Sequence, residues 1–313
     1  FLVCYRSLAA WCHACHHRQL PRHLQFCLQI CNRSSSAHHC TGRSRKPHQF
    51  ASIMAAKALL LLSSAAALQA PCKRRSATHL AAQSLAELAE QSSLPPADKS
   101  RITVLSDADA VGAEVWKRID EAGKRAVEER GTFTLAIPGG SVLKMLAGSS
   151  PSWAEDCLLA YVNHKAVDDD ADATLSTHAK ARAGFLDAGW DGVDVLNLGG
   201  SSDAVAEACR YAELLELATQ QNLLPVAATA SGESIPVFDM MVIGVGDDGH
   251  VGSLYPNRDE CTDDYSWCLP VEMKDPGSIS LSLPVMRAAR EVLVAACGVS
   301  EKYPQGKSDA MKR

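Results

Sequence analysis

Short, largely apolar segments recur along the last two thirds of this sequence and alternate with amphipathic helical patterns. The segments lie at 133–137, 158–162, 193–198, 240–245 and 292–297. A strand that is apolar on both faces belongs to a sheet that is covered on both sides, and helices between such strands are typical of parallel connections. The sequence therefore predicts an α/β fold with a mainly parallel sheet and helices on both faces.

The helical patterns between these segments have recognisable starts and buried faces. After a short strand at 102–105, Ser106 or Asp107 can cap a helix. Its apolar positions recur at helical spacing and are Val111, Val115, Ile119, Ala122 and Ala126. Further helices are predicted at 176–188 and 203–221. Because ligands of such sheets bind at the carboxyl ends of the strands, the loops that follow the strands are the places to search for a site.

The sequence before residue 96 has the character of a leader. The first methionine is Met54, so we interpret residues 1–53 as upstream or non-native sequence. From Met54 to residue 95, a short alanine-rich apolar run is followed by Ala70-Pro71 and three basic residues, a layout typical of targeting segments. Pro95-Pro96 then separates this leader and linker from a domain at 96–313, which we expect to be truncated at its C-terminal end.

Composition excludes several classes of partner. The net charge of −5 gives no basic surface for nucleic acid. The apolar run of the leader is too short for a good membrane span, so no membrane is expected in the mature protein. Cys12-x-x-Cys15 has zinc-ligand spacing, but no second pair accompanies it, and the domain itself has no such cluster. We therefore predict neither a metal nor a cofactor.

The strand at 133–137 runs into Pro138-Gly139-Gly140-Ser141 and then a helix-like segment. Glycines let the backbone approach an anion, and Ser141 with the free amides of a helix start can donate hydrogen bonds to it. The turn is thus a candidate phosphate cradle. The same four residues are also common in an ordinary tight turn, which is the structural alternative.

The strand at 240–245 delivers a second glycine-rich turn that carries two carboxylates beside a histidine. The turn reads Gly246-Asp247-Asp248-Gly249-His250, and Ser253 follows shortly after it. His250 can take a proton from water, and a neighbouring carboxylate can hold its ring in the required tautomer. Backbone amides in such a turn can face a developing oxyanion. The alternative is a solvent-exposed polar loop.

These two turns, in this order and about a hundred residues apart, resemble the family of 6-phosphogluconolactonases and glucosamine-6-phosphate deaminases. The Gly-x-Gly-x-Asp-Gly-His turn that ends at His250 is the most specific part, and the similarity spans most of residues 100–313. The resemblance implies a modified Rossmann-like, sugar-phosphate isomerase/lactonase-like fold. It also implies phosphate at Gly139, Gly140 and Ser141, and His250 near the reacting carbon.

Residue differences decide between the two branches of that family. Deaminases have a carboxylate pair after the strand that follows the phosphate turn, where this chain has Asn163-His164-Lys165. They also have Asn-Glu-Pro after the signature histidine, where this chain has Leu254-Tyr255-Pro256. With Ser253, that segment instead resembles the Ser-Leu-Phe-Pro of lactonases. The resemblance therefore implies a lactonase.

This chain also departs from the lactonases. Many of them have Asp-Glu-Arg at the position of Asn163-His164-Lys165, and an arginine at the position of Ser278. We therefore assign the cation for the phosphate to Lys165 and Lys302, although both can equally be ordinary solvated lysines. His178 lies where the family has a segment close to the site, but we interpret it as a helix-surface histidine of the predicted helix.

The resulting hypothesis is hydrolysis of 6-phospho-D-glucono-1,5-lactone to 6-phospho-D-gluconate in the oxidative pentose phosphate pathway. His250 and Asp248 are the predicted catalytic residues. The predicted substrate and phosphate ligands are Gly139, Gly140, Ser141, Asn163, Lys165, Gly246, Asp247, Gly249, Ser253 and Lys302. The alternatives are a glucosamine-6-phosphate deaminase and a non-catalytic sugar-phosphate-binding relative. The leader resembles the two-part plastid leaders of algae with complex plastids, so we expect a plastid location, with the cytoplasm as the alternative.

Overall fold

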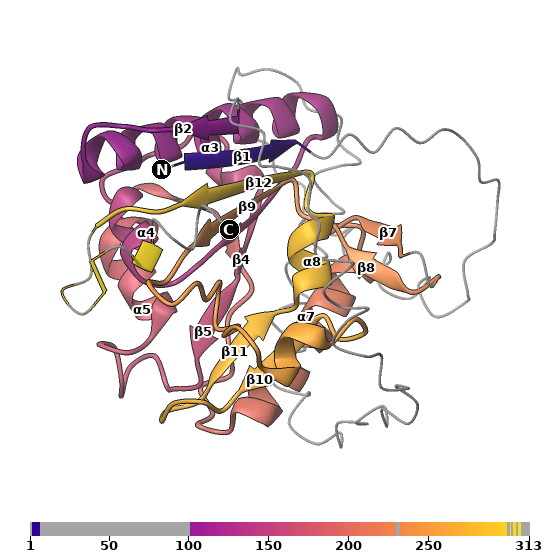
Figure 1. The fold of residues 1–313 in the computed structure, drawn as a ribbon. Helices are drawn as coiled ribbons and strands as arrows, with labels where there is room; N and C mark the ends of the chain where they lie inside the picture. Colours follow the sequence, from indigo (N-terminus) through magenta and orange to yellow (C-terminus); the bar gives the residue numbers. More distant parts are fainter. Residues whose placement is uncertain are drawn as a thin grey trace, which may run out of the picture.

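A computed structural model describes residues 2–6, 101–229, 232–298, 301, 303–304 and 306–307. Its main sheet is seven-stranded within this part of the chain (Figure 1). Across the sheet the order is β2 (Ile102–Thr103), β1 (Leu2–Arg6), β12 (Glu291–Ala295), β9 (Met240–Gly244), β3 (Phe133–Ile137), β4 (Cys157–Tyr161) and β6 (Asp194–Val195). The pairs from β12 to β6 are parallel, and β1 is antiparallel to both of its neighbours. The predicted mainly parallel sheet is therefore confirmed.

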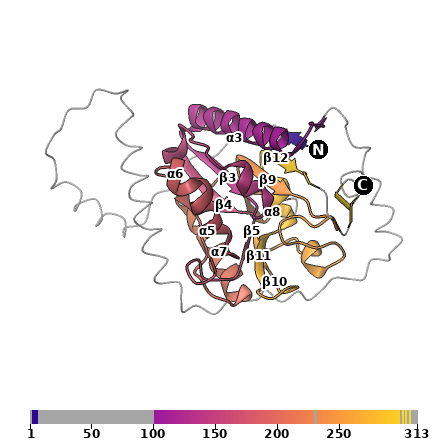
Figure 2. The ribbon, with the colours of Figure 1, turned by 90° about the vertical axis from the view of Figure 1, so that its left-hand side faces the viewer.

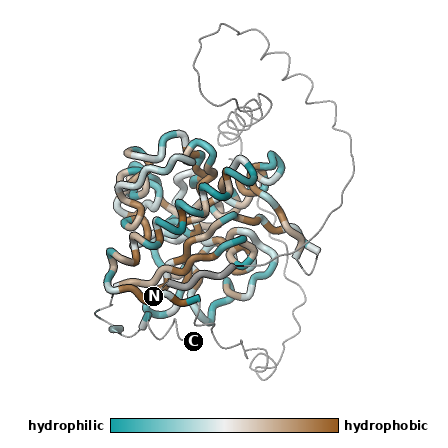
Figure 3. Tube along the Cα trace, turned by 90° about the horizontal axis from the view of Figure 1, so that it is seen from above, coloured by the Kyte–Doolittle hydropathy of each residue, from teal (hydrophilic) through white to brown (hydrophobic). Residues whose placement is uncertain are grey.

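The side chains of the central strands alternate between two hydrophobic clusters, one on each face of the sheet. Leu135 and Val242 belong to the cluster that packs against α3 (Ala108–Arg130). Ala136, which follows Leu135, and Met241, which precedes Val242, belong to the opposite cluster. Hydrophobic stretches run through the interior of the chain trace, and hydrophilic segments lie around them (Figure 3). This alternation explains why the strands are apolar throughout, because neither face meets water.

Helices cover both faces, as the sequence predicts. The first cluster includes residues of α3, α4 (Ser141–Met145), α5 (Thr177–Ala181) and a π-helical turn at Arg182–Leu186, which leads into α6 (Asp187–Gly189). The second includes residues of α7 (Ala204–Gln220) and α8 (Leu283–Ala288). The Asp107 side chain caps α3 by accepting a hydrogen bond from the Ala110 amide at 2.8 Å. Two 3₁₀ turns, Ala154–Asp156 and Asp259–Thr262, complete the described helical segments.

A second, three-stranded antiparallel sheet was not predicted as a unit. It consists of β10 (Cys268–Val271), β11 (Ser278–Leu281) and β5 (Asn163–Lys165), in that order. It packs with α7 on the second face, at the opposite end of the molecule from α3 (Figure 2). β5 begins two residues after β4, so this sheet continues the edge at which the parallel strands end. A short hairpin of β7 (Val226–Ala228) and β8 (Ser234–Pro236) lies apart from both sheets (Figure 1).

The structure also shows where the predicted boundaries differ from the observed elements. The predicted helix at 176–188 is a series of short α and π turns, and the predicted strand at 193–198 is only two residues long. Strand β1 lies ahead of the expected domain start at residue 96, a boundary that stays a prediction. The leader at 54–95 and the Cys12-x-x-Cys15 segment fall outside the described residues. In the part of the chain that the structure describes, no helix is long and apolar enough to cross a membrane.

A buried carboxylate joins the amino-terminal ends of β3 and β9. The Asp239 side chain accepts hydrogen bonds from the Thr134 amide at 2.9 Å and from the Thr134 hydroxyl at 3.0 Å. It also pairs with Arg130 at 2.8 Å and with Arg290 at 3.1 Å, while it is itself only 5% exposed. A buried carboxylate is costly unless its oxygens are satisfied in this way. Asp239 thus ties two strands to the end of α3.

We predict that Asp239→Ala lowers the free energy of unfolding by about 1–3 kcal/mol, because it leaves the buried Thr134 amide without its acceptor. Urea unfolding followed by circular dichroism measures this change. The matched control is Glu129→Ala, which removes the other partner of Arg130 at a site that is 56% exposed. That control is expected to cost less than about 1 kcal/mol. Equal, small effects of both substitutions would contradict the role given to Asp239.

Candidate active site

One cleft opens at the edge where β3, β9 and β12 end, and β5 and β11 form its floor on the other side. Its volume is about 560 Å³. Most of the residues predicted from the sequence line it, namely Gly139, Gly140, Ser141, Asn163, Lys165, Gly246, Asp247, His250 and Ser253. Asp248 and Gly249 lie in the same loop without lining the cleft, and Lys302 is outside the described residues. The roles of all these residues stay predictions, but the structure brings the nine that line the cleft together.

The loop after β9 holds the imidazole of His250 close to its own backbone. The Gly246 amide donates to the His250 carbonyl at 2.9 Å, which closes the loop into a tight ring. A Cβ at Gly246 would lie only 2.2 Å from the His250 Nδ1 and Cε1 atoms. No side chain fits there. Glycine at position 246 is therefore what allows the His250 imidazole to fold back over the loop.

The Asp248 carboxylate orients the His250 ring. Its Oδ1 lies 2.5 Å from the His250 Nδ1 and also accepts from the His250 amide at 3.2 Å. Burial alone would raise the pKa of Asp248, but the hydrogen bonds from the His250 backbone and ring and the charge of His250 together hold this pKa below its usual value. An ionised Asp248 accepts a hydrogen bond from Nδ1–H, so Nε2 carries no hydrogen and is the basic nitrogen of the ring. His250 is therefore set up to take a proton through Nε2.

Tyr255 and Lys274 stack behind this histidine. The ring of Tyr255 lies 4.8 Å from that of His250, centroid to centroid. The Lys274 ammonium lies 5.0 Å from the Tyr255 centroid, on the ring face. Hydrogen bonding with Tyr255 raises the pKa of Lys274, which keeps this cation charged. The stack places a positive charge near the histidine at a position that the sequence analysis did not identify.

The turn after β3 is held by Asn163. The Gly139 amide donates to the Asn163 Oδ1 at 3.1 Å, and the Asn163 Nδ2 donates to the Ser253 hydroxyl at 3.3 Å. Asn163 thus connects the Gly139 turn with the loop that carries His250. Gly140 has a positive φ of 80°, a conformation that suits glycine, and no side chain caps the start of α4. Gly140 and Ser141 remain exposed on the wall of the cleft.

The structure corrects the role expected for two glycine amides. The sequence predicts that glycine amides of this turn face a developing oxyanion. Instead Gly246 donates to the His250 carbonyl, and Gly249 donates to the Gly246 carbonyl at 3.1 Å. Both donors are used in the backbone hydrogen bonds that close the loop around His250. Charge at a reacting oxygen must therefore be stabilised by other groups of the cleft.

The cleft is lined mainly by positive charge. Its described lysines are Lys165, Lys180, Lys274 and Lys307, and its one described carboxylate is Asp247. Sequence reasoning found only Lys165 among them, because the other three come from segments without a motif. Burial lowers the pKa of Lys165, and the nearby charge of Lys274 lowers it further. Two ammonium groups that repel each other in a cleft are stabilised by a bound anion.

Lys165 lies next to the place where many lactonases have an arginine. In the pairing of β5 with β11, Lys165 is directly opposite Ser278, and its ammonium donates to the Pro276 carbonyl at 2.6 Å. Ser278 is buried and lines the cleft. Lys165 thus supplies a cation beside Ser278, where this chain lacks the arginine. No group of three potential metal ligands occurs among the described residues.

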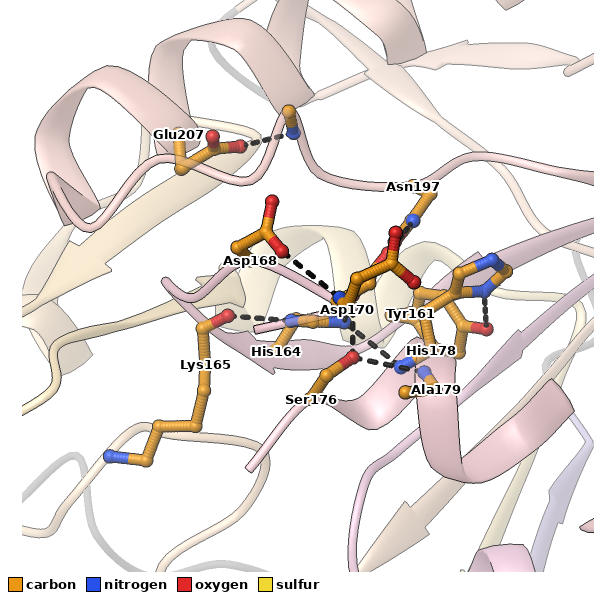
Figure 4. Close-up of polar contacts among 12 residues, drawn as sticks. Tyr161, His164, Lys165, Asp168, Asp170, Ser176, His178, Ala179, Asn197 and Glu207 are labelled. Carbon is orange, nitrogen blue, oxygen red and sulfur yellow. Dashed lines mark hydrogen bonds and ion pairs between the residues drawn. The ribbon is translucent and has the colours of Figure 1, made fainter. Parts of the chain in front are cut away.

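His178 is not the surface residue expected from the sequence. Its ring is half-buried, and its Nδ1 lies 2.8 Å from the Tyr161 hydroxyl (Figure 4). The preceding residue, Thr177, is buried and lines the cleft. A Cβ at Gly139 would lie 3.0 Å from the Thr177 hydroxyl, so α5 abuts the turn after β3. The start of α5 is therefore part of the cleft wall.

Several known proteins are similar to this chain. The 6-phosphogluconolactonase of Bos taurus is 28% identical over 228 residues, which are 68% of this chain and 80% of the relative. The chloroplastic 6-phosphogluconolactonase 3 of Arabidopsis thaliana is 26% identical over 231 residues, 69% of this chain and 66% of the relative.

Two solved structures share the fold. The 6-phosphogluconolactonase of Trypanosoma brucei superposes with a TM-score of 0.53 at 22% identity, over 67% of this chain and 90% of that protein. For the enzyme of Shewanella baltica the TM-score is 0.50 at 23% identity, over 66% of this chain and 83% of that protein. The family model described as glucosamine-6-phosphate isomerases/6-phosphogluconolactonase matches residues 106–309. With this match over most of the chain and the two turns brought together in one cleft, the chain belongs to the family of glucosamine-6-phosphate isomerases and 6-phosphogluconolactonases.

Proposed function

We propose that this protein hydrolyses 6-phospho-D-glucono-1,5-lactone to 6-phospho-D-gluconate, a step of the oxidative pentose phosphate pathway. The observation that carries the proposal is the His250–Asp248 pair, with Nδ1 on the carboxylate at 2.5 Å, in a cleft lined by lysines. The relatives that match over most of their length are named 6-phosphogluconolactonases, which supports the same reaction.

The cleft offers a simple route for hydrolysis. The phosphate binds at Gly140 and Ser141 with help from cleft lysines, and this anchors the lactone with its carbonyl near His250. Nε2 of His250 takes a proton from a water molecule as the oxygen of that water bonds to the carbonyl carbon. The tetrahedral oxyanion forms beside Lys274, whose charge stabilises it. Collapse of this intermediate breaks the bond to the ring oxygen, which receives the proton back from His250.

The isomerase branch is the alternative activity, and the residues of the cleft disfavour it. At the two places where deaminases have carboxylates, the cleft presents the amide of Asn163 and the phenol of Tyr255. An amide is not a base, and a neutral phenol is a much weaker base than the carboxylate that deaminases have there. A non-catalytic sugar-phosphate-binding protein would need no oriented histidine, and the Asp248 contact disfavours that alternative too.

A plastid location is the finer part of the proposal. The leader at 54–95 lies outside the described residues, and the support comes from its sequence and from a chloroplastic relative. Cytoplasm is the alternative. A fluorescent fusion of the full chain, with and without residues 54–95, distinguishes the two, since only the plastid assignment requires the leader for import.

We predict that His250→Ala lowers kcat/KM for the lactone by about 10²–10⁴-fold, the usual contribution of a general base. Asp248→Asn should cause a smaller loss that appears in kcat, because the amide no longer enforces the Nδ1–H tautomer. Freshly generated lactone, assayed against its spontaneous hydrolysis, gives both values. Asp264→Asn, an exposed acid outside the cleft, is the control. Wild-type rates in His250→Ala, or release of ammonia from glucosamine 6-phosphate by the wild type, would contradict the proposal.

We also predict that Lys165→Gln raises KM about tenfold or more, because it removes a charge-assisted contact worth about 1.5–3 kcal/mol. Lys274→Gln should instead lower kcat, because it removes the charge that stabilises the oxyanion only in the transition state. Steady-state kinetics at low ionic strength measures the effect. Lys117→Gln, on the exposed side of α3 where the lysine is 60% exposed, should leave KM unchanged. If Lys165→Gln behaves like Lys117→Gln, the phosphate is bound elsewhere, and if Lys274→Gln does, another group stabilises the oxyanion.

A further inference from the structure

A buried histidine lies behind the cleft and is distinct from the one in the catalytic loop. His164, the middle residue of β5, is 0% exposed. Its Nδ1 lies 2.6 Å from the Lys165 carbonyl, and its Nε2 lies 3.0 Å from the His178 amide at the start of α5 (Figure 4). The imidazole therefore bridges two elements that both line the cleft.

The two backbone partners fix the proton of this ring. A carbonyl only accepts a hydrogen bond and an amide only donates one, so Nδ1 must carry the hydrogen and Nε2 must be unprotonated. His164 is consequently neutral in the observed arrangement. A second proton on the ring would place an N–H against the His178 N–H and break the bridge.

The residues around the bridge hold the beginning of α5. The Ser176 hydroxyl caps this helix by accepting from the Ala179 amide at 2.9 Å, and it donates to Asp169 at 2.5 Å. The other oxygen of Asp169 accepts from the Asn197 side chain at 2.6 Å. With the bond from His178 to His164, these contacts determine where α5 begins (Figure 4).

Both elements joined by His164 present side chains to the substrate cleft. On β5, Asn163 and Lys165 flank it in the sequence and line the cleft. On α5, Thr177 and Lys180 line the same cleft, and Thr177 abuts the Gly139 turn. A shift of α5 relative to β5 would change the spacing between these two walls.

We propose that His164 is a positioning residue for substrate binding, whose neutral ring holds the α5 wall against the β5 wall, so that protonation of this one buried side chain loosens the cleft and weakens binding of the sugar phosphate. The proposal rests on the proposed lactonase function for its kinetic readout. Its structural basis, the bridge between two backbone groups, is independent of the chemistry at His250.

The charged groups around His164 define how it responds to acid. Burial lowers the pKa of His164, and the charges of His178 and Lys180 on α5 lower it further. The hydrogen bond to the Lys165 carbonyl and the charge of Asp169, whose Oδ1 lies 3.8 Å from Nε2, act in the opposite direction. Tyr161, on β4, faces the ring edge-on at 5.4 Å. A protonated ring would turn its N–H toward Asp169 and compete with Ser176 for the same oxygen.

The sign of the pH dependence follows from this direction. The pKa of His164 in the folded protein lies below its ordinary value of 6.5, so the neutral ring contributes its full stabilisation above that pH. The contribution is lost as the pH falls from 6.5 toward the lowered pKa of the folded state. Substrate binding that depends on the neutral ring weakens as the pH falls through this range. The loss of affinity is about twofold at the pKa of His164 in the folded protein and about tenfold one pH unit lower.

The test compares His164→Gln and His164→Leu with the wild type by measuring kcat and KM from about pH 5 to pH 8. Glutamine can accept from the His178 amide through its Oε1 and does not titrate, whereas leucine fills the space without an acceptor. We expect the leucine variant to raise KM at neutral pH by about tenfold, the loss of one buried hydrogen bond, with kcat within about twofold of wild type. We expect the glutamine variant to keep a near-normal KM at neutral pH and to lose part of the increase in KM at acid pH.

His178→Gln is the matched control, because burial also lowers the pKa of His178. Its backbone amide still donates to His164, so the increase in KM at acid pH should remain. The phosphate of the substrate also gains a proton near pH 6, but it does so equally with every variant. Titration calorimetry with 6-phosphogluconate gives the same comparison without turnover.

The outcomes separate the two proposals. If the wild type binds 6-phosphogluconate but does not accelerate lactone hydrolysis, the lactonase function is contradicted. The positioning role of His164 is then tested by the binding measurements alone. An active wild type whose acid-side KM profile is unchanged in His164→Gln overturns the positioning role. If the leucine variant does not fold, the glutamine variant still decides the matter.

Discussion

The register between β3 and β9 is the constraint on which the site depends. Each strand ends in one of the two turns, and the strands pair in parallel with Leu135 beside Met240. At their other ends, the Asp239 carboxylate accepts hydrogen bonds from both the amide and the hydroxyl of Thr134. A slip of one residue would move every side chain to the other face of the sheet and strand this carboxylate. The Gly139 turn and the His250 loop therefore face one another because the far ends of their strands are fixed.

The amide of Asn163 is suited to joining those two turns. It accepts from the Gly139 amide and donates to the Ser253 hydroxyl at the same time. An ionised carboxylate, which only accepts, could make the first contact but would depend on the serine proton for the second. A neutral bridge also adds no negative charge to a cleft that binds an anion. The departure from the carboxylate typical of the lactonases thus preserves the connection, while Lys165 supplies charge beside Ser278.

The sequence predicted the parts of the fold that periodicity and turn chemistry control. Strands β3 and β9 were expected at almost their observed bounds, because their apolar character reflects burial on both faces. The small sheet of β10, β11 and β5 was not expected as a unit, since pairing between distant short strands leaves little local pattern. Lys180, Lys274 and Lys307 escaped notice for the same reason. Each lies in the cleft through tertiary packing and not through a motif. The amides of Gly246 and Gly249 are not free to face an oxyanion, because the loop uses both donors for its own closure.

His250 in the cleft and His164 behind it show how the environment of a histidine determines whether it can exchange protons. His250 has a side chain that is 29% exposed, and its Nδ1 contacts a carboxylate, so its Nε2 can exchange a proton with water or substrate. His164 is fully buried, and backbone groups occupy both of its nitrogens, so a proton can be added only by breaking a bond. A ring that exchanges protons at each turnover could not also hold α5 in place, because its hydrogen-bonding pattern would reverse with every cycle. In the proposed mechanism, separating the two tasks lets His250 change its charge while the walls of the cleft stay fixed.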